Sequence, residues 1–332
     1  MKYLALLFSA IAVISCSQPS SVHTLQGNAL GTTYSLKYFS DSQITSSEID
    51  SILSIINSSM STYMDSSDIS KLNGGDTTIV VDEHFQYVFE ASKRIHKATN
   101  GYFDPSVGLL VNAYGFGPEG YTSNVTPEQI DSLYHFIGFD KVKLNNDSTI
   151  SFESASYIDF NAIAKGYTVD VIGDFLASRG AENYLVEIGG EVIVNGKNLD
   201  SDSPWKIGIE TPVENGSREL KYAIQLRNQA LATSGNYRKF RVDSTSGQKF
   251  VHTINPKTGK SQKTDILSAS VVAETCADAD AFATAFMAMG LQPSKAYLES
   301  NKDISAILIY SDDAGNQKTF ISDALEATLE EF

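Results

Sequence analysis

The stretch that indicates the fold most directly is residues 157–166, Tyr-Ile-Asp-Phe-Asn-Ala-Ile-Ala-Lys-Gly. Its first four residues, Tyr157–Phe160, are predicted to form a buried strand, and a tight polar loop follows them. The next segment, from about Tyr167 to Arg179, is predicted to be a helix that Gly180 terminates. A strand, a loop and a helix in succession are typical of a domain in which helices cover a sheet.

Outward from this stretch, helix-like and strand-like segments alternate irregularly. Apolar spacing predicts amphipathic helices at Ser47–Met60 and Phe85–Ala98, and an Ala/Phe/Met-rich helix is predicted at Ala277–Met289. Thr126-Pro127-Glu128-Gln129 is a capping box with proline at the first helical position. We expect Gly138 to stop the helix that this box begins.

Short strands dominate the second half of the chain. Lys141–Leu144 and Thr149–Phe152 flank a turn and predict a hairpin. Further strands are predicted at Tyr184–Ile188, Glu191–Val194, Trp205–Glu210, Tyr222–Leu226, Lys239–Val242 and Ile266–Val272. Together with the helices, these strands predict a mixed α/β sandwich, an α+β fold of sheets packed with helices.

The composition is that of a folded globular protein. The chain has 332 residues, of which 42% are hydrophobic and 20% charged, so it can bury a sizeable core. Because no linker rich in Pro, Ser/Gly or like charges interrupts its body, we expect one large domain. The formal net charge of -15 repels phosphate backbones, so nucleic-acid binding is not expected.

Residues 1–16 have the form of a secretory signal that ends in a cysteine. A lysine at the second position precedes the short apolar run Leu4–Ile14, and the small residue before Cys16 resembles a bacterial lipoprotein processing site. On this interpretation residues 17–24 form a tether and residues 25–332 a single domain. The acylated Cys16 would then anchor an exported, periplasm-facing protein to the membrane. An ordinary cleaved signal with an incidental cysteine is the alternative.

Several familiar motifs are absent or out of context. Residues 115–120 match GxGxxG, and Asp140 follows at a suitable distance, but Pro118 interrupts the stretch and no helix opens from it. A glycine-rich loop is therefore preferred to a dinucleotide fingerprint. HExxH, GxSxG, CxxC and Walker motifs are absent, so zinc chemistry is not expected. Cys16 and Cys276 are the only cysteines, which leaves no internal disulfide framework.

Four side chains carry candidate chemistry. Asp280 and Thr284 are four residues apart on a predicted helix, so both can present oxygen ligands to a hard cation; a solvent-facing polar stripe is the alternative. Lys165 lies beside the N–H groups of a helix start, which suits an anionic ligand, with a solvated lysine as the alternative. His252 ends a strand that breaks into a turn, a location favoured for sites, although a structural histidine is the simpler interpretation of this residue alone.

These motifs, in this order, resemble the ApbE family of FAD:protein FMN transferases, which are bacterial lipoproteins or secreted proteins. The resemblance covers nearly the whole chain after the leader. It implies an ApbE-like, T-fold-like arrangement of sheets packed with helices, with a flavin pocket between subdomains. The matching segments are Leu30–Tyr34, Met60–Tyr63, Ile69–Asn73, Thr99–Gly117, Asp159–Tyr167, Glu187–Glu191, Ser234–Tyr237, His252–Gly259 and Ala277–Ala285.

The resemblance also implies roles for residues. It assigns Mg²⁺ ligation to Ala162 through its carbonyl and to Asp280, Ala283 and Thr284. It assigns FAD contacts to Leu30, Tyr114, Gly115, Phe116, Asp159, Lys165 and Ile254. The implied reaction transfers the FMN moiety of FAD to a threonine hydroxyl and releases AMP. Lys165 would neutralise phosphate charge, and His252 is the candidate to accept the hydroxyl proton.

The implied acceptors are exported flavoprotein subunits of redox-driven membrane complexes that carry threonine in a short exposed motif. Three alternatives remain open at this point. One is a Mg²⁺-dependent FAD pyrophosphatase, in which water replaces the threonine hydroxyl. Another is a non-catalytic flavin-binding lipoprotein, and the simplest is an adhesin or structural lipoprotein without nucleotide affinity. The presence of Lys165, His252, Asp280 and Thr284 favours catalysis, since a flavin carrier needs no metal-binding helix.

Overall fold

The computed structural model describes residues 21–120, 125–153, 156–212, 219–236, 240–242, 249–261 and 264–332. The predicted leader with Cys16 lies outside the described residues, as do Tyr237 and Lys239 of the predicted segments. Among the described residues no helix is long and apolar enough to cross a membrane.

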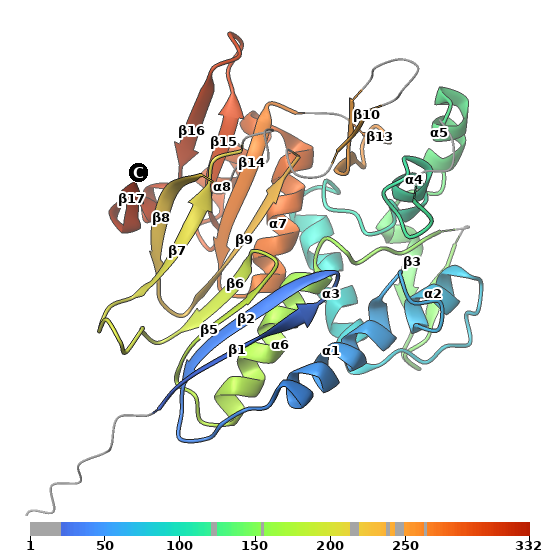
Figure 1. The fold of residues 1–332 in the computed structure, drawn as a ribbon. Helices are drawn as coiled ribbons and strands as arrows, with labels where there is room; N and C mark the ends of the chain where they lie inside the picture. The colour runs from blue at the N-terminus through green and yellow to red at the C-terminus, as the bar shows by residue number, and fades with distance from the viewer. Residues whose placement is uncertain are drawn as a thin grey trace, which may run out of the picture.

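An eight-stranded antiparallel sheet forms the centre of the molecule (Figure 1). Its strands follow the order β1-β2-β5-β6-β9-β14-β15-β16. β1 and β16 are therefore the edges, and the strands that end at the site described below lie between them. The strands are β1 (Val22–Ala29), β2 (Thr32–Phe39), β5 (Asn183–Ile188), β6 (Glu191–Asn195), β9 (Gln229–Gly235), β14 (Ile266–Ala273), β15 (Ser305–Ser311) and β16 (Gln317–Ile321).

Helices cover one face of this sheet. α6 (Ala164–Ser178) packs on β5 and β6, and α7 (Cys276–Met289) packs on β9 and β14 and against α6. α7 is buried almost all round, as its Ala/Phe/Met composition requires. Three further helices pack on this pair and complete the layer: α1 (Ser46–Met60), α3 (Glu83–Ala98) and α8 (Leu291–Ser300).

A smaller sheet covers the other face. It consists of β7 (Trp205–Glu210), β8 (Leu220–Leu226) and β17 (Leu329–Glu331), in the order β17-β8-β7. Trp205 and Ile224 of this sheet share a buried cluster with side chains of β6, β9, β14 and β15 of the large sheet. The domain thus has three layers: helices, the large sheet and the small sheet.

Most of the remaining elements form a lobe beside the helical layer (Figure 1). Leu110, Tyr114, Phe116, Ile130 and Ile254 form its own buried cluster. The lobe contains α4 (Gly108–Ala113), α5 (Pro127–Tyr134), β10 (Phe240–Val242), β11 (Lys249–Val251), β12 (Ile254–Asn255) and β13 (Lys260–Ser261). The elements α2 (Asp68–Asn73), β3 (Val142–Leu144) and β4 (Ile150–Phe152) instead bury Ile69, Val142 and Ile150 in the core cluster of α3 and α7. Two 3₁₀ helices, η1 (Phe139–Lys141) and η2 (Asp323–Thr328), complete the described elements.

The mixed α+β prediction is confirmed, and most predicted elements lie within a few residues of their expected bounds. Two boundaries were wrong. Val22–Thr24, expected in the tether, belong to β1, because they pair in register with β2. The capping box at Thr126 does begin α5, but α5 ends at Tyr134 rather than near Gly138.

The predicted strand Tyr157–Phe160 is wrong: this segment is buried in part but belongs to no sheet. Ile158 and Phe160 are fully buried. The amide side chain of Asn73 donates to the Ile158 carbonyl and accepts from the Ile158 N–H, both at 2.8 Å. A single bridge pairs Tyr157 with Val107, and the Asp159 N–H donates to the Pro105 carbonyl at 2.8 Å. Asn73 and these two contacts replace the ladder of a neighbouring strand, which allows the segment to be buried outside any sheet.

Candidate active site

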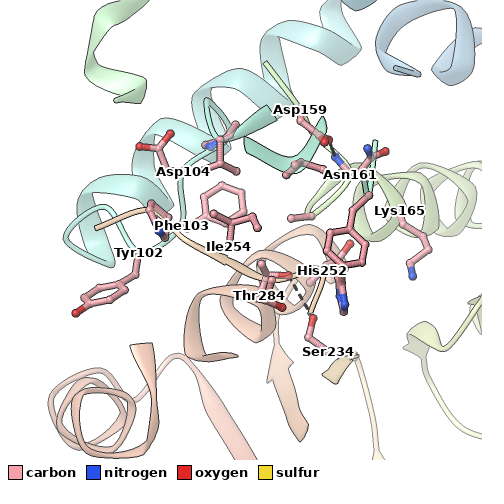
Figure 2. Close-up of a pocket in the computed structure, with 18 of the residues that line it drawn as sticks. Tyr102, Phe103, Asp104, Asp159, Asn161, Lys165, Ser234, His252, Ile254 and Thr284 are labelled. Carbon is pink, nitrogen blue, oxygen red and sulfur yellow. Dashed lines mark hydrogen bonds between the residues drawn. The ribbon is translucent and has the colours of Figure 1, made fainter. Parts of the chain in front are cut away.

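A cavity of about 390 Å³ lies where the ends of β5, β6 and β9 meet the starts of α6 and α7 (Figure 2). This volume falls in the usual range of small-molecule sites, roughly 300–1,000 Å³. Eight predicted site residues line it together: Phe116, Asp159, Ala162, Lys165, His252, Ile254, Asp280 and Thr284. They come from four separate stretches of the chain, so the tertiary structure assembles the site.

The lobe supplies an apolar and aromatic wall. Phe116 and Ile254 are buried in the lobe's cluster and line the cavity, and Val107 and Val111 lie beside them. Phe116 meets the His252 ring edge-on, with 6.5 Å between the ring centroids. A planar aromatic ligand can be held against such a wall through burial and ring contacts.

The opposite side of the cavity carries an ion pair whose carboxylate is buried and whose lysine is half-buried. Lys165, on the first turn of α6, places Nζ 2.7 Å from Oε2 of Glu191 at the start of β6. Burial would lower the pKa of Lys165, but the charges of Glu191 and Asp280 outweigh it and hold this pKa above its ordinary value. Burial, and next the charge of Asp280, raise the pKa of Glu191, and the adjacent Lys165 ammonium opposes this rise and favours the ionised carboxylate. Lys165 therefore presents an ammonium group to any ligand in the cavity.

Asp280 and Thr284 both face the cavity from α7, as their spacing predicted. Oδ2 of Asp280 accepts the backbone N–H of Gly166 at 3.0 Å, and the Thr284 hydroxyl lies 3.2 Å from that of Ser234. Burial raises the pKa of Asp280, although Lys165 and the Gly166 N–H partly oppose this. A cation beside the carboxylate would favour its ionised form.

This donor set fits a hard cation. Ala162 lines the same cavity, so a carboxylate, a hydroxyl and a backbone carbonyl can contribute oxygen atoms, which Mg²⁺ prefers. Within the described part of the chain no group of three or more His, Cys, Asp or Glu side chains could hold a metal ion. A cation at Asp280 would therefore depend on neutral oxygen ligands and on the substrate's own phosphates.

The other predicted residues lie elsewhere. Tyr114 and Gly115 do not line the cavity; Tyr114 is buried behind it and donates from its hydroxyl to the Gly259 carbonyl at 3.3 Å. Ala283 is fully buried in the core. The glycine-rich stretch after Tyr114 follows helix α4 rather than a strand, which confirms that it is no dinucleotide fingerprint.

Leu30 lines a neighbouring hollow instead. It lies in the turn between β1 and β2, where its φ is 49°. The hollow runs along α1 and shares Tyr63, Asn161 and Lys165 with the main cavity. The two hollows thus adjoin at Lys165, on either side of which the two halves of a ligand could lie.

Sequence reasoning missed Glu191 as a functional residue. In the sequence it only follows the glycine pair Gly189-Gly190 within a matching motif. In the structure its buried carboxylate holds Lys165 in place. Asp104 and Asn161 also line the cavity without having been predicted. A glutamate directly after two glycines in a strand-forming sequence is the only signal that could have drawn attention to Glu191.

Solved structures of similar architecture are flavin transferases. A structure described as flavin transferase ApbE from Vibrio cholerae superposes with a TM-score of 0.82 at 33% identity and covers 93% of this chain and 100% of that one. The apo form of Pseudomonas stutzeri flavinyl transferase ApbE superposes with a TM-score of 0.81 at 28% identity and covers 93% of this chain and 96% of that one. The fold and the site thus define an enzyme of the transferase class.

Proteins of similar sequence carry names of the same activity as these solved structures. The FAD:protein FMN transferase of Haemophilus influenzae is 35% identical over 320 residues, which cover 92% of this chain and 91% of the relative. The protein of the same name from Vibrio cholerae is 34% identical and covers 94% of this chain and 95% of its own. A sequence profile of the ApbE family matches residues 30–308. The chain belongs to the ApbE family.

Proposed function

We propose that this protein transfers the FMN moiety of FAD to a threonine hydroxyl of an acceptor protein, releases AMP and depends on Mg²⁺. The observation that carries the proposal is the assembly of Lys165, His252, Asp280 and Thr284 around one cavity with an aromatic wall. A site of this composition can bind a flavin by its ring and a pyrophosphate by its charge.

FAD has two halves joined by a pyrophosphate, and the two adjoining hollows match this division. The isoalloxazine ring would lie against Phe116 and Ile254, and the remaining half would extend past Lys165 toward Leu30. Lys165 would then lie near the pyrophosphate, where its ammonium group can neutralise developing negative charge.

In the proposed reaction the threonine Oγ forms a bond to the phosphorus of the FMN half. The bond from that phosphorus to the bridging oxygen breaks, and AMP leaves with this oxygen and its electron pair. His252 accepts the hydroxyl proton, and Glu191 keeps Lys165 on the phosphate side of the cavity. Mg²⁺ held by Asp280, Thr284 and the Ala162 carbonyl would stabilise charge on the phosphate oxygens.

We further propose that the chain is an exported lipoprotein anchored through Cys16 and that its acceptors are exported flavoprotein subunits of redox-driven membrane complexes. The form of residues 1–16 and the resemblance to a family of lipoproteins support this location. A membrane anchor would hold the enzyme next to membrane-bound acceptors and raise their effective concentration.

The test incubates the purified protein with FAD, Mg²⁺ and a threonine-bearing polypeptide of such a subunit. Covalent flavin fluorescence of the acceptor on a denaturing gel, with equimolar AMP, is the expected result. The matched controls are Asp280→Ala, which removes the charged cation ligand, and a Thr→Val acceptor. Removal of the general base in His252→Gln should lower kcat by about 10²–10⁴-fold.

Each other outcome has a defined meaning. AMP and free FMN with an unlabelled acceptor would instead indicate an FAD pyrophosphatase. Tight FAD binding without either product would indicate a flavin carrier. AMP release by Asp280→Ala at the unmodified rate would refute the metal assignment.

A further inference from the structure

Helices α6 and α7, which carry Lys165, Asp280 and Thr284, are joined by hydrogen bonds in both directions. The Gly166 N–H of α6 donates to Oδ2 of Asp280 on α7 at 3.0 Å. One turn further along α6, Oδ1 of Asp170 accepts the Cys276 N–H at 2.7 Å and Oδ2 accepts the Ala277 N–H at 2.8 Å. Each helix therefore holds the other by a carboxylate bonded to backbone N–H groups.

Asp170 occupies a position that only a two-oxygen acceptor can fill. Its side chain is buried, and both oxygens are used by successive N–H groups at the first turn of α7. Such N–H groups have no partner within their own helix, and a carboxylate is favoured at this positive end. Charge-assisted hydrogen bonds of this length are among the strong ones.

The contact between the helices is close enough to transmit this restraint. Gly166 lies so near α7 that a Cβ atom there would stand 2.2 Å from the Cys276 carbonyl oxygen. The start of α7 is thus fixed against α6 on one side by Asp170 and on the other by Gly166. Asp280 and Thr284 follow on the same helix, one and two turns later.

We propose that Asp170 is a positioning residue for the cation site: by holding the first turn of α7 against α6 it sets where Asp280 and Thr284 stand relative to Lys165 and Ala162. This inference rests on the metal assignment under the proposed function. Asp170 does not line the cavity but bonds to the first turn of α7, so it acts on the site through that helix. Partners that orient metal ligands typically change metal affinity by roughly 10–100-fold when they are replaced.

The test measures cation binding by the full chain without substrate. Free Mn²⁺, a paramagnetic probe for a Mg²⁺ site, is followed by electron paramagnetic resonance during titration at pH 8. This pH lies above the pKa of Asp170, which burial raises to about 7, so its carboxylate is ionised. Asp170→Asn keeps the shape but leaves only one acceptor oxygen, and we expect the Mn²⁺ dissociation constant to rise roughly 10–100-fold.

Asp82→Asn is the matched control. Oδ1 of Asp82 accepts the Phe85 N–H and the Ser59 hydroxyl, both at 2.8 Å, at the start of α3, which contributes nothing to the cavity. This variant makes the same chemical change at another helix start, where both bonds reach one oxygen that asparagine retains, and the Mn²⁺ constant should be unchanged. In AMP-release assays, Asp170→Asn should likewise need roughly 10–100-fold more Mg²⁺ for half-maximal rate.

An unchanged Mn²⁺ constant in a folded Asp170→Asn protein, whatever its stability, would overturn the inference. If that variant does not fold, Asp170→Glu replaces it: this keeps both acceptor oxygens but displaces them by one methylene, and an unchanged constant again overturns the inference. Asp280→Ala distinguishes a failure of the metal assignment from a failure of the positioning role alone. If it binds Mn²⁺ as tightly as the unmodified protein, the metal assignment itself fails, and the positioning role fails with it.

Discussion

Gly166→Ala tests whether the close contact between α6 and α7 is needed for activity. The added Cβ would lie 2.2 Å from the Cys276 oxygen and 2.9 Å from the Ala277 nitrogen, and both of these are backbone atoms. Since ordinary Cβ contacts begin near 3.4 Å, the two helices have to separate by about 1 Å. That shift lengthens the bond from the Gly166 N–H to Asp280, which is 3.0 Å in the native protein.

The magnitude follows from this displacement. Overpacking of a close-packed interior costs about 1–3 kcal/mol, and the helical preference for Ala over Gly returns only about 0.5–1 kcal/mol. We therefore expect Gly166→Ala to lower the free energy of unfolding by about 1–2 kcal/mol. Because a shift of about 1 Å in a catalytic group can cost 10²-fold in rate, we expect kcat for AMP release to fall by about that factor.

Gly173→Ala is the control on the same helix. Its Cβ would meet Cγ2 of Ile193 at 3.2 Å and Cε2 of Tyr184 at 3.3 Å, which are side-chain atoms that can move by a few tenths of an ångström. This variant should keep native activity and stability. Urea unfolding and AMP release at saturating FAD and Mg²⁺ are compared for both variants. Native kcat and native stability in Gly166→Ala would refute the reasoning.

Three further predictions concern single side chains. Glu191→Gln removes the carboxylate that lies 2.7 Å from Nζ of Lys165 and fixes its position. Because a displacement of about 1 Å at a catalytic site can cost 10²-fold in rate, kcat should fall at least about tenfold, and an unchanged kcat would show that Lys165 needs no such partner. Phe116→Ala removes the aromatic wall of the cavity and should weaken FAD binding by roughly tenfold or more in a flavin fluorescence titration, whereas equal affinity would place the ring elsewhere. Burial, and next the charge of Asp174, raise the pKa of Tyr184 to about 12, so this tyrosine ionises at lower pH in the unfolded chain than in the folded protein and the free energy of unfolding falls between about pH 10 and 12. In urea unfolding Tyr184→Phe should lose less stability over this range, and an equal loss in both proteins would contradict the assignment.

Local signals in the sequence were sufficient for much of the fold. The capping box at Thr126 and the apolar spacing of Ser47–Met60 and Phe85–Ala98 gave helices at the expected places. These signals act within a few residues, so they survive in any tertiary context that buries the apolar face. The spacing of Asp280 and Thr284 likewise predicted that both would share one helix face, and both line the cavity.

The motif order also determined the family, because many short matches in the same order are specific where each alone is weak. The motifs did not determine which of the predicted FAD-contacting residues line the main cavity. Leu30 lies in the neighbouring hollow, and Tyr114 supports the cavity wall from behind instead of lining it. Whether a loop residue faces a ligand depends on the packing of several loops, which short motifs do not encode.

The sequence by itself therefore determined the helices, most strands, the acidic surface and the membership of the family. Only the tertiary structure decided that Tyr157–Phe160 is no strand, since the Asn73 amide that satisfies its backbone lies 85 residues earlier. It also decided that Glu191 pairs with Lys165, and that Asp170 holds the start of α7, 106 residues later in the chain. Each of these contacts satisfies a buried polar group, and a buried polar group needs a hydrogen-bond or charged partner. The partner can lie far away in the sequence, so local sequence spacing does not predict it.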